Sequence, residues 1–321
     1  MSHLLSPAFM SLEVPDRDEW FPILDSFPRP DWDAIRGWER AWIKKDKYAE
    51  CTHQCVRHWL NRTQRALGEP YTVSESKHFH FLSGHEAKMR DRVLDYLETA
   101  RSQIARILGD VAWTSGMGKH VVLRFTNPED YYRYISYYYS EGEHAGSGGV
   151  FLHRDYRHIA YPESFSPDSE RKTLAHELTH NLVAHLPLPR WLNESLAQAF
   201  DTDIGGGRHK ELDRELTEKH HAYWNEETIQ EFWQGRSFGT VAGQTVSYSL
   251  ARLLLKLIHQ DLRPKPESFR RFVLQSSWND GGDAAAREQL GINLNELVSI
   301  FLGQGPWAPD PTRWKSQKGK S

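Results

Sequence analysis

The chain has 321 residues, with 40 Lys and Arg against 43 Asp and Glu, a formal net charge of −3 and hydrophobic residues at 39%. This near-neutral balance argues against nucleic acids or an anionic membrane surface as partners, since both are normally bound through a basic excess. Two cysteines exclude a disulfide framework, and no apolar run reaches the ~18 residues that a membrane-spanning helix needs.

The first 70 residues predict a helical N-terminal extension. Residues 1–30 contain several prolines and little periodic apolar character, which indicates an irregular arm. Apolar residues at helical spacing predict one helix over residues 31–42 and a second over residues 48–67, which Gly68 ends. The start of the chain lacks a basic segment followed by a long apolar run, so we expect no secretory signal and a cytoplasmic protein.

Two cysteines and two histidines lie together on the second predicted helix. Cys51, His53, Cys55 and His58 could form a second metal site, but their spacing matches no zinc module. The alternative is a pair of reduced thiols one helical turn apart on a packed face, and we favour it.

Residues 71–165 combine strand and helix patterns and predict a small mixed sheet. In residues 77–82, Phe79 and Phe81 alternate with two histidines, which predicts a strand with the rings on one face. The further expected elements are a helix over 85–108, a strand over 120–125, a short helix over 128–139, a glycine-rich loop over 141–149 and a hairpin of strands 149–153 and 157–161. Residues 166–305 are almost wholly helical, and residues 306–321 predict a flexible tail. The expected fold class is therefore α+β.

One predicted helix contains the motif H-E-x-x-H, formed by His176, Glu177 and His180. Ser166 and Pro167 predict the start of this helix. Histidines four residues apart lie on one helix face, so their imidazoles can bind one cation. Glu177 is turned by about 100° from His176, so it cannot bind the same ion but can reach a water beside it.

A third ligand decides whether the motif is a metal site. His185 lies five residues after His180 and would point to the back of a continued helix. The metzincin pattern is excluded, because it needs a glycine where the chain has Val183 and a ligand where it has Leu186. Glu194 follows a proline-rich turn, and a second short helix would bring it back toward the two histidines.

The ligands His176, His180 and Glu194 would leave a fourth position open, as in catalytic rather than structural zinc sites. Mixed nitrogen and oxygen donors make Zn²⁺ the expected ion, one per chain. Glu177 is the expected general base, which takes a proton from water and can return it to the leaving amine.

The residues after Glu194 fit this arrangement. Ala197 is small enough to let the two helices approach closely. Gln198 and Asp201 follow Glu194 by four and seven residues, so both can share its helical face and orient the imidazoles by hydrogen bonds. Asp201 is the preferred partner, and the alternative is that it only begins the turn before Gly205.

The segments His176-Glu-Leu-Thr-His180 and Trp191-Leu-Asn-Glu194-Ser-Leu-Ala resemble the motifs of the gluzincin metallopeptidases. The resemblance is closest to the compact bacterial peptidase MA-like group with its W-L-N-E-G-L-A pattern, in which Ser195 replaces the glycine. It covers residues 72–303 and implies a mainly helical, thermolysin-like catalytic lobe beside a small sheet with an edge-strand hairpin. The linker between the ligands is shorter than in the thermolysin and aminopeptidase branches, so their substrate rules do not carry over.

The resemblance also implies roles for residues away from the ligands. The strand with Gly149, Val150, Phe151 and, at its end, His153 resembles the edge strand that pairs with an extended substrate backbone in this clan. Tyr248 opens an apolar helix about fifty residues past the glutamate, where gluzincins often supply a hydrogen-bond donor to the oxyanion. Packing of Tyr248 on the core is the alternative.

The sequence therefore predicts a zinc-dependent metallopeptidase that acts on a peptide or protein substrate, with no nucleic-acid or membrane partner. The alternatives are a hydrolase of a non-peptide amide or ester, a zinc-binding regulatory module without turnover, and an enzyme-like helical protein without a metal. Glu177 argues against the regulatory module, because binding alone requires no base at that position.

Overall fold

The computed structural model describes residues 12–114, 118–139, 148–163, 166–206 and 212–314. These residues form an α+β fold in which helices predominate. The strands are β1 (Ile23–Leu24), β2 (Phe27–Pro28), β3 (Thr72–Glu75), β4 (Phe79–Ser83), β5 (His120–Phe125), β6 (Val150–Leu152) and β7 (His158–Pro162). The helices are α1 (Trp32–Trp42), α2 (Tyr48–Leu67), α3 (Ala87–Leu108), α4 (Pro128–Ser136), α5 (Pro167–Val183), α6 (Arg190–Asp203), α7 (Arg214–Tyr223), α8 (Thr228–Trp233), α9 (Gln244–Leu257), α10 (Pro266–Gln275), α11 (Asp283–Leu290) and α12 (Leu294–Leu302).

The larger sheet is mixed and has the strand order β3-β4-β5-β7-β6. The pairs β4–β5 and β5–β7 are parallel, whereas β3–β4 and β6–β7 are antiparallel. The predicted hairpin is present as β6 and β7, and β6 forms one edge of the sheet. The strand β3 at the other edge was not expected from the sequence.

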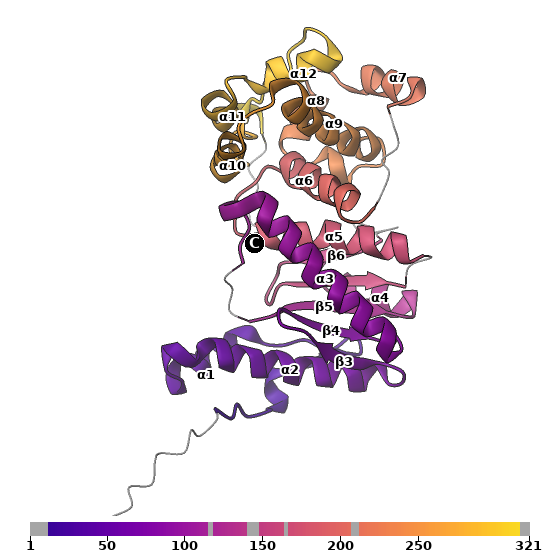
Figure 1. The fold of residues 1–321 in the computed structure, drawn as a ribbon, viewed down its shortest axis with the longest axis vertical. Helices are drawn as coiled ribbons and strands as arrows, with labels where there is room; N and C mark the ends of the chain where they lie inside the picture. The colour runs from indigo at the N-terminus through magenta and orange to yellow at the C-terminus, as the bar shows by residue number, and fades with distance from the viewer. Residues whose placement is uncertain (1–11, 115–117, 140–147, 164–165, 207–211, 315–321) are drawn as a thin grey trace, which may run out of the picture.

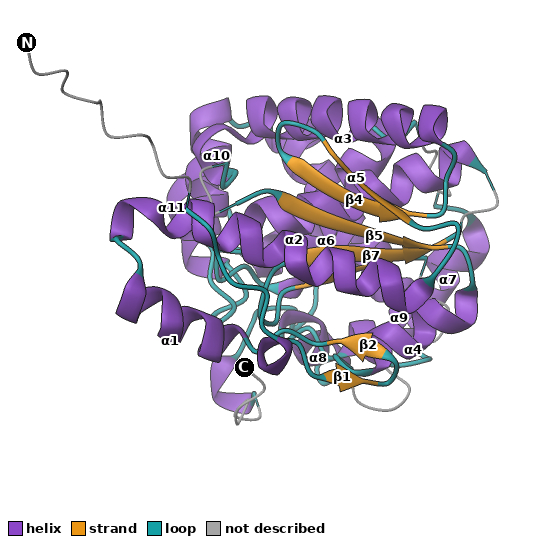
Figure 2. Cartoon of the chain, turned by 90° about the horizontal axis from the view of Figure 1, so that it is seen from below, coloured by secondary structure: helices purple, strands orange, loops and turns teal. Residues whose placement is uncertain are grey.

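The side chains of the sheet alternate between two hydrophobic cores. Phe79 and Phe81 pack with α3 and α5 on one face, as the alternating pattern predicts, whereas Leu82 packs with α1, α2 and α4 on the other. Figure 1 shows the resulting layers, with α1 and α2 below the sheet, α5 above it and the remaining C-terminal helices beyond α5. Figure 2 shows α2 crossing the lower face of the sheet.

The first part of the N-terminal extension is more ordered than predicted. Instead of an irregular arm, residues 12–30 contain a short 3-10 helix and the hairpin β1–β2. Trp20, Phe21 and Phe27 are buried in the core that α2 shares with the sheet. Three large aromatic rings thus fix this segment against α2, because their burial removes a large apolar area from water.

The helix with the H-E-x-x-H motif begins where the sequence predicts. The Ser166 hydroxyl accepts a hydrogen bond from the backbone N–H of Ser169 at 3.1 Å, and Pro167 is the first helical residue. This hydroxyl satisfies one of the backbone donors that every helix start leaves free.

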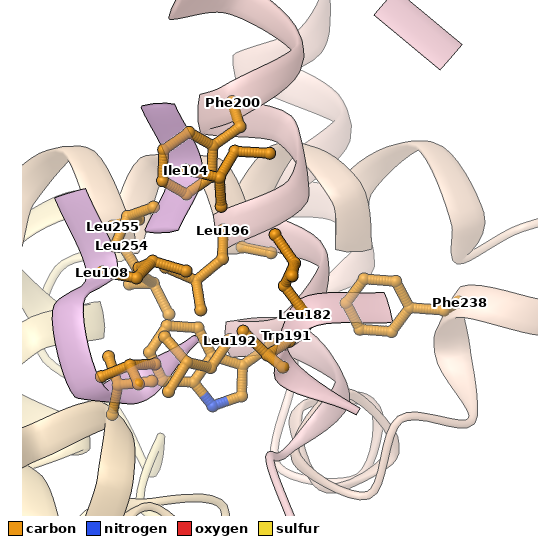
Figure 3. Close-up of a cluster of buried hydrophobic side chains, with 14 of the residues drawn as sticks. Ile104, Leu108, Leu182, Trp191, Leu192, Leu196, Phe200, Phe238, Leu254 and Leu255 are labelled. Atoms are coloured by element: carbon orange, nitrogen blue, oxygen red, sulfur yellow. The ribbon is translucent and has the colours of Figure 1, made fainter. Parts of the chain in front are cut away.

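The helices that follow α5 share one core with it. Leu192, Leu196 and Phe200 of α6 point into a cluster with side chains of α3, α5 and α9, which Figure 3 shows. The four-residue spacing puts these three residues on one side of α6, and their offsets of two and six residues from Glu194 make it the side opposite to Glu194. The core therefore fixes the rotation of α6 about its axis.

The first part of the predicted flexible tail is packed against the rest of the structure. Trp307 is only 8% exposed, and its backbone oxygen accepts a hydrogen bond from the indole of Trp233 at 2.8 Å. The segment up to residue 314 therefore packs against the helical lobe. The predicted tail beyond it, and the predicted loop over 141–147, lie outside the described residues. Among the helices that the structure describes, none is both long and apolar enough to cross a membrane.

Candidate metal centre

The two histidines of the motif form a pair on α5. His176 and His180 are four residues apart, and their ring centroids are 4.8 Å apart with the planes at 82°. Their side chains are 20% and 13% exposed, so both rings are largely removed from water. The helical repeat alone places the two rings side by side.

Glu194 of α6 completes a three-residue cluster with this pair. Its Oε2 atom lies 3.6 Å from Nε2 of His176 and 3.6 Å from Nε2 of His180. This oxygen is buried and has no hydrogen-bond partner among the described residues. Two donors on one tetrahedral zinc ion lie about 3.3 Å apart, since Zn–N and Zn–O bonds are about 2.0–2.2 Å long. The cluster therefore has the spacing that a single divalent ion requires, as the sequence predicts.

The second nitrogen of each imidazole has its own partner. Nδ1 of His176 lies 3.3 Å from Oδ2 of Asp201, which the sequence predicts. Nδ1 of His180 donates to Oδ1 of Asn193 at 2.8 Å, a contact that the sequence analysis missed. Partners at Nδ1 leave the Nε2 lone pairs directed at the cluster, the usual arrangement of metal-binding histidines.

The cluster concentrates negative charge. Burial by itself raises the pKa of Glu194, but the close contact with His176 and the charges of His180 and Arg190 outweigh burial and hold this pKa at about 2. Burial lowers the pKa of His176, yet Asp201 and Glu194 outweigh it and raise this pKa to about 10. Without an ion, a proton on His176 balances the carboxylates, so the site is built to hold positive charge.

Glu177 lies beside the cluster but outside the ligand set. It is 8% exposed, and the backbone N–H of Phe151 donates a hydrogen bond to its carboxylate. Burial raises its pKa and the nearby Glu194 adds to the rise, whereas His176 and His180 oppose it. The result is a buried carboxylate with a raised pKa, which is a favourable property for a general base.

The edge strand β6 runs directly against the motif helix. A Cβ atom built on Gly149 would lie 2.4 Å from Cγ2 of Thr173 and 3.6 Å from Cγ of Glu177, so only glycine fits at this point. Val150 is buried, Phe151 is partly buried, and His153 is exposed just after the strand. Within the part of the chain that the structure describes, β6 pairs with β7 alone, so no strand covers its other edge, where the N–H of Phe151 binds Glu177.

Tyr248 comes to the same region from the start of α9. Burial raises its pKa, and the negative charges of Glu194 and Glu177 raise it further, whereas Arg190 lowers it. Its ring packs on Phe238 with centroids 5.2 Å apart, so the predicted packing role is also present. The structure therefore brings the phenol within electrostatic reach of both carboxylates.

Two other predicted residues have different surroundings. The amide nitrogen of Gln198 donates to the backbone oxygen of Tyr248 at 3.2 Å, so this side chain joins α6 to α9. His185 lies beyond the end of α5 and packs near Trp113, with ring centroids 5.9 Å apart. The rejection of His185 as a ligand agrees with this position.

Sequence reasoning missed Arg190 as well as Asn193. Nε of Arg190 lies 3.6 Å from Oε1 of Glu194, the oxygen that does not face the histidines. The four-residue spacing of Arg190 and Glu194 on one helix is the sequence feature that could have indicated this contact. Arg190 therefore orients Glu194 so that its other oxygen faces the cluster.

No family model matches this chain, and no curated protein matches it.

Proposed function

We propose that this protein is a zinc-dependent metallopeptidase whose metal ligands are His176, His180 and Glu194. The observation that carries the proposal is the buried Oε2 atom of Glu194, which has no hydrogen-bond partner among the described residues and lies 3.6 Å from both Nε2 atoms. An oxygen left unpaired in a buried site is costly unless a ligand occupies the site. Two imidazoles and one carboxylate match the ligand set of catalytic zinc.

Zinc bound there would lower the pKa of a bound water and polarise the carbonyl of the substrate. Glu177 accepts a proton from the attacking water and delivers it to the leaving amine. The N–H of Phe151 holds its carboxylate in place for this transfer. Tyr248 supplies a hydrogen bond to the oxyanion from the side of α9.

The edge strand β6 supports a peptide as the substrate. An extended peptide can add to an unpaired strand edge through backbone hydrogen bonds, which need no particular side chains. Phe151 of this strand also contacts Glu177, so a backbone bound along β6 lies next to the general base. A small ester would make no use of this edge.

Hydrolysis of a mixed peptide library by zinc-loaded protein tests the proposal. Glu177→Gln should retain the fold and the zinc but lose about 10²–10⁴-fold in turnover, the range for a proton-transfer residue. Asp168→Asn is the matched control, because this carboxylate lies on the same helix and is 77% exposed. We expect it to cleave at the wild-type rate.

Three outcomes would contradict the proposal. Cleavage by Glu177→Gln at the wild-type rate would exclude Glu177 as the base. Zinc-loaded wild type that cleaves only non-peptide esters or amides would assign the site to that class of substrate, and zinc binding without turnover of either class would indicate a regulatory module.

A further inference from the structure

A second cluster of metal-binding side chains lies on the other face of the sheet. His80 of β4 points to the face that packs on α2, whereas Phe79 and Phe81 point to the face that packs on α5. Glu75 of β3 is directly opposite His80 in the antiparallel pair, and His53 projects from α2 onto the same point. Three segments of the chain thus bring two imidazoles and one carboxylate together.

His80 contacts the other two side chains through different ring nitrogens. Its Nε2 lies 3.3 Å from Nδ1 of His53, and its Nδ1 lies 3.5 Å from Oε2 of Glu75, so an ion would bind only one of these nitrogens. One ligand atom from each residue can be chosen so that all three lie within 4.8 Å of one another. Hydrogen bonds from nitrogen to oxygen are normally about 2.7–3.2 Å long, so the contact with Glu75 is longer than a good hydrogen bond.

The Nδ1 atom of His80 carries the argument for a ligand. His80 is 1% exposed, and this nitrogen has no hydrogen-bond partner among the described residues. Buried polar atoms almost always have a partner, so an unpaired one marks a place where a ligand completes the site. Glu75 is the nearest acidic group to this nitrogen and its side chain is 43% exposed, which leaves room for water to complete the coordination.

The charges around the cluster are compatible with a cation. Nζ of Lys119 lies 3.2 Å from Oε2 of Glu75, but it also donates to the backbone oxygen of Ser76 at 2.6 Å. The ammonium therefore keeps a partner when the carboxylate turns toward an ion.

We propose that His53, Glu75 and His80 form a second site for a divalent cation of the zinc type, which joins α2 to the sheet. Two imidazoles and a carboxylate select this class of ion over the oxygen-preferring Mg²⁺ and Ca²⁺. The site shares no residue with the catalytic cluster and lies across the sheet from α5. Its role is structural: an ion there ties the N-terminal extension to β3 and β4.

Counting bound zinc in the full-length protein tests this site. Protein equilibrated with zinc in the presence of a competing chelator should contain two ions per chain. His53→Gln and Glu75→Gln should each contain one, and Glu75 is exposed enough that its replacement leaves the fold intact. His58→Gln is the matched control on the same helix, because His58 faces the backbone oxygen of Val14 instead, and it should still contain two.

The same count separates this site from the catalytic one. His180→Ala should contain one ion, and His180→Ala combined with His53→Gln should contain none. If the second site binds zinc but the catalytic site does not, the wild type would contain one ion and His53→Gln would contain none. Unchanged zinc in both His53→Gln and Glu75→Gln would overturn the second site.

Thermal unfolding provides an independent readout. Zinc at about 100 times its dissociation constant should raise the Tm of His180→Ala by roughly 4 °C. The same zinc should leave the Tm of the double variant unchanged. An unchanged Tm in His180→Ala would show that no ion joins α2 to the sheet.

Discussion

The environment of Glu194 fits a metal site better than an ordinary cluster of ion pairs. Its Oε1 atom faces Arg190 and its Oε2 atom faces both histidines, each at 3.6 Å. These contacts are too long for good hydrogen bonds, whereas Nδ1 of His180 has a close partner in Asn193 at 2.8 Å. His180 is thus closely bound by its outer partner, whereas the inward-facing atoms are held apart at the spacing of metal ligands.

A prediction at this scale concerns Tyr248. Tyr248→Phe removes the hydroxyl but keeps the ring that packs on Phe238. We expect kcat to fall about 10²-fold, the usual cost of one oxyanion donor, with little change in KM. Steady-state kinetics on a cleaved peptide measure both constants. Tyr132→Phe, at a partly exposed tyrosine of α4, is the control, and a fully active Tyr248→Phe would assign the oxyanion to another group.

The contact between β6 and α5 joins the edge strand to the helix that carries Glu177. Gly149 lets the strand approach Thr173 more closely than any side chain permits. The N–H of Phe151, two residues later, then reaches Glu177. One close approach therefore positions both the edge strand and Glu177, the proposed general base.

A substitution of Thr173 should compensate for a substitution of Gly149. Gly149→Ala places a methyl group 2.4 Å from Cγ2 of Thr173 and pushes the strand away. A misplacement of about 1 Å near reacting groups can cost about 10²-fold, so we expect a loss of kcat/KM of that order. Thr173→Ser removes the clashing methyl group, so it should be nearly neutral alone and should restore much of the activity of Gly149→Ala. Equal activity of Gly149→Ala and wild type would show that this contact does not position the site.

How well the sequence predicts a feature depends on whether the interactions that form it are local or long-range. The helices α2, α3 and α5 were predicted because their apolar spacing, caps and stop signals are local. The strand β3, with the sequence Thr-Val-Ser-Glu, was missed because four partly exposed residues carry almost no pattern without the neighbouring β4. His176, His180 and Glu194 follow from spacing, but the contact of Asn193 with His180 depends on how α5 and α6 cross, which periodicity does not encode.

The whole molecule depends on several buried histidines that remain neutral. His158, for example, donates from Nδ1 to the backbone oxygen of Tyr156 at 2.7 Å and accepts from the hydroxyl of Tyr134 at 2.8 Å. Burial lowers the pKa of His158 to about 4, and burial does the same for His120 and His220. Protonation of such a ring removes an acceptor inside the core.

This arrangement predicts acid sensitivity of the metal-free protein. The folded pKa of these histidines lies below the unfolded value of 6.5, so their stabilising contribution is fully present above pH 6.5 and is lost as the pH falls toward 4. Each contributes at most about 3 kcal/mol. The raised pKa of His176 has the opposite effect on stability. Its contribution is present below pH 6.5 and is lost between pH 6.5 and about 10, above the range in which the buried histidines titrate.

Denaturant unfolding between pH 7.5 and 4.5 measures this dependence. The free energy of unfolding should decrease steadily below pH 6.5. His158→Gln should be less stable at pH 7.5 but show a shallower decrease, because one titrating group is gone. A stability that stays constant down to pH 4.5 would contradict the role of these histidines.

Binding of one metal ion by His176, His180 and Glu194 underlies the proposed chemistry, and anomalous diffraction at the zinc edge from zinc-equilibrated crystals tests it most directly. We expect an anomalous peak about 2.0–2.2 Å from Nε2 of both histidines and from Oε2 of Glu194. Zinc-equilibrated crystals without a peak at this position would contradict the metal centre and, with it, the proposed hydrolysis.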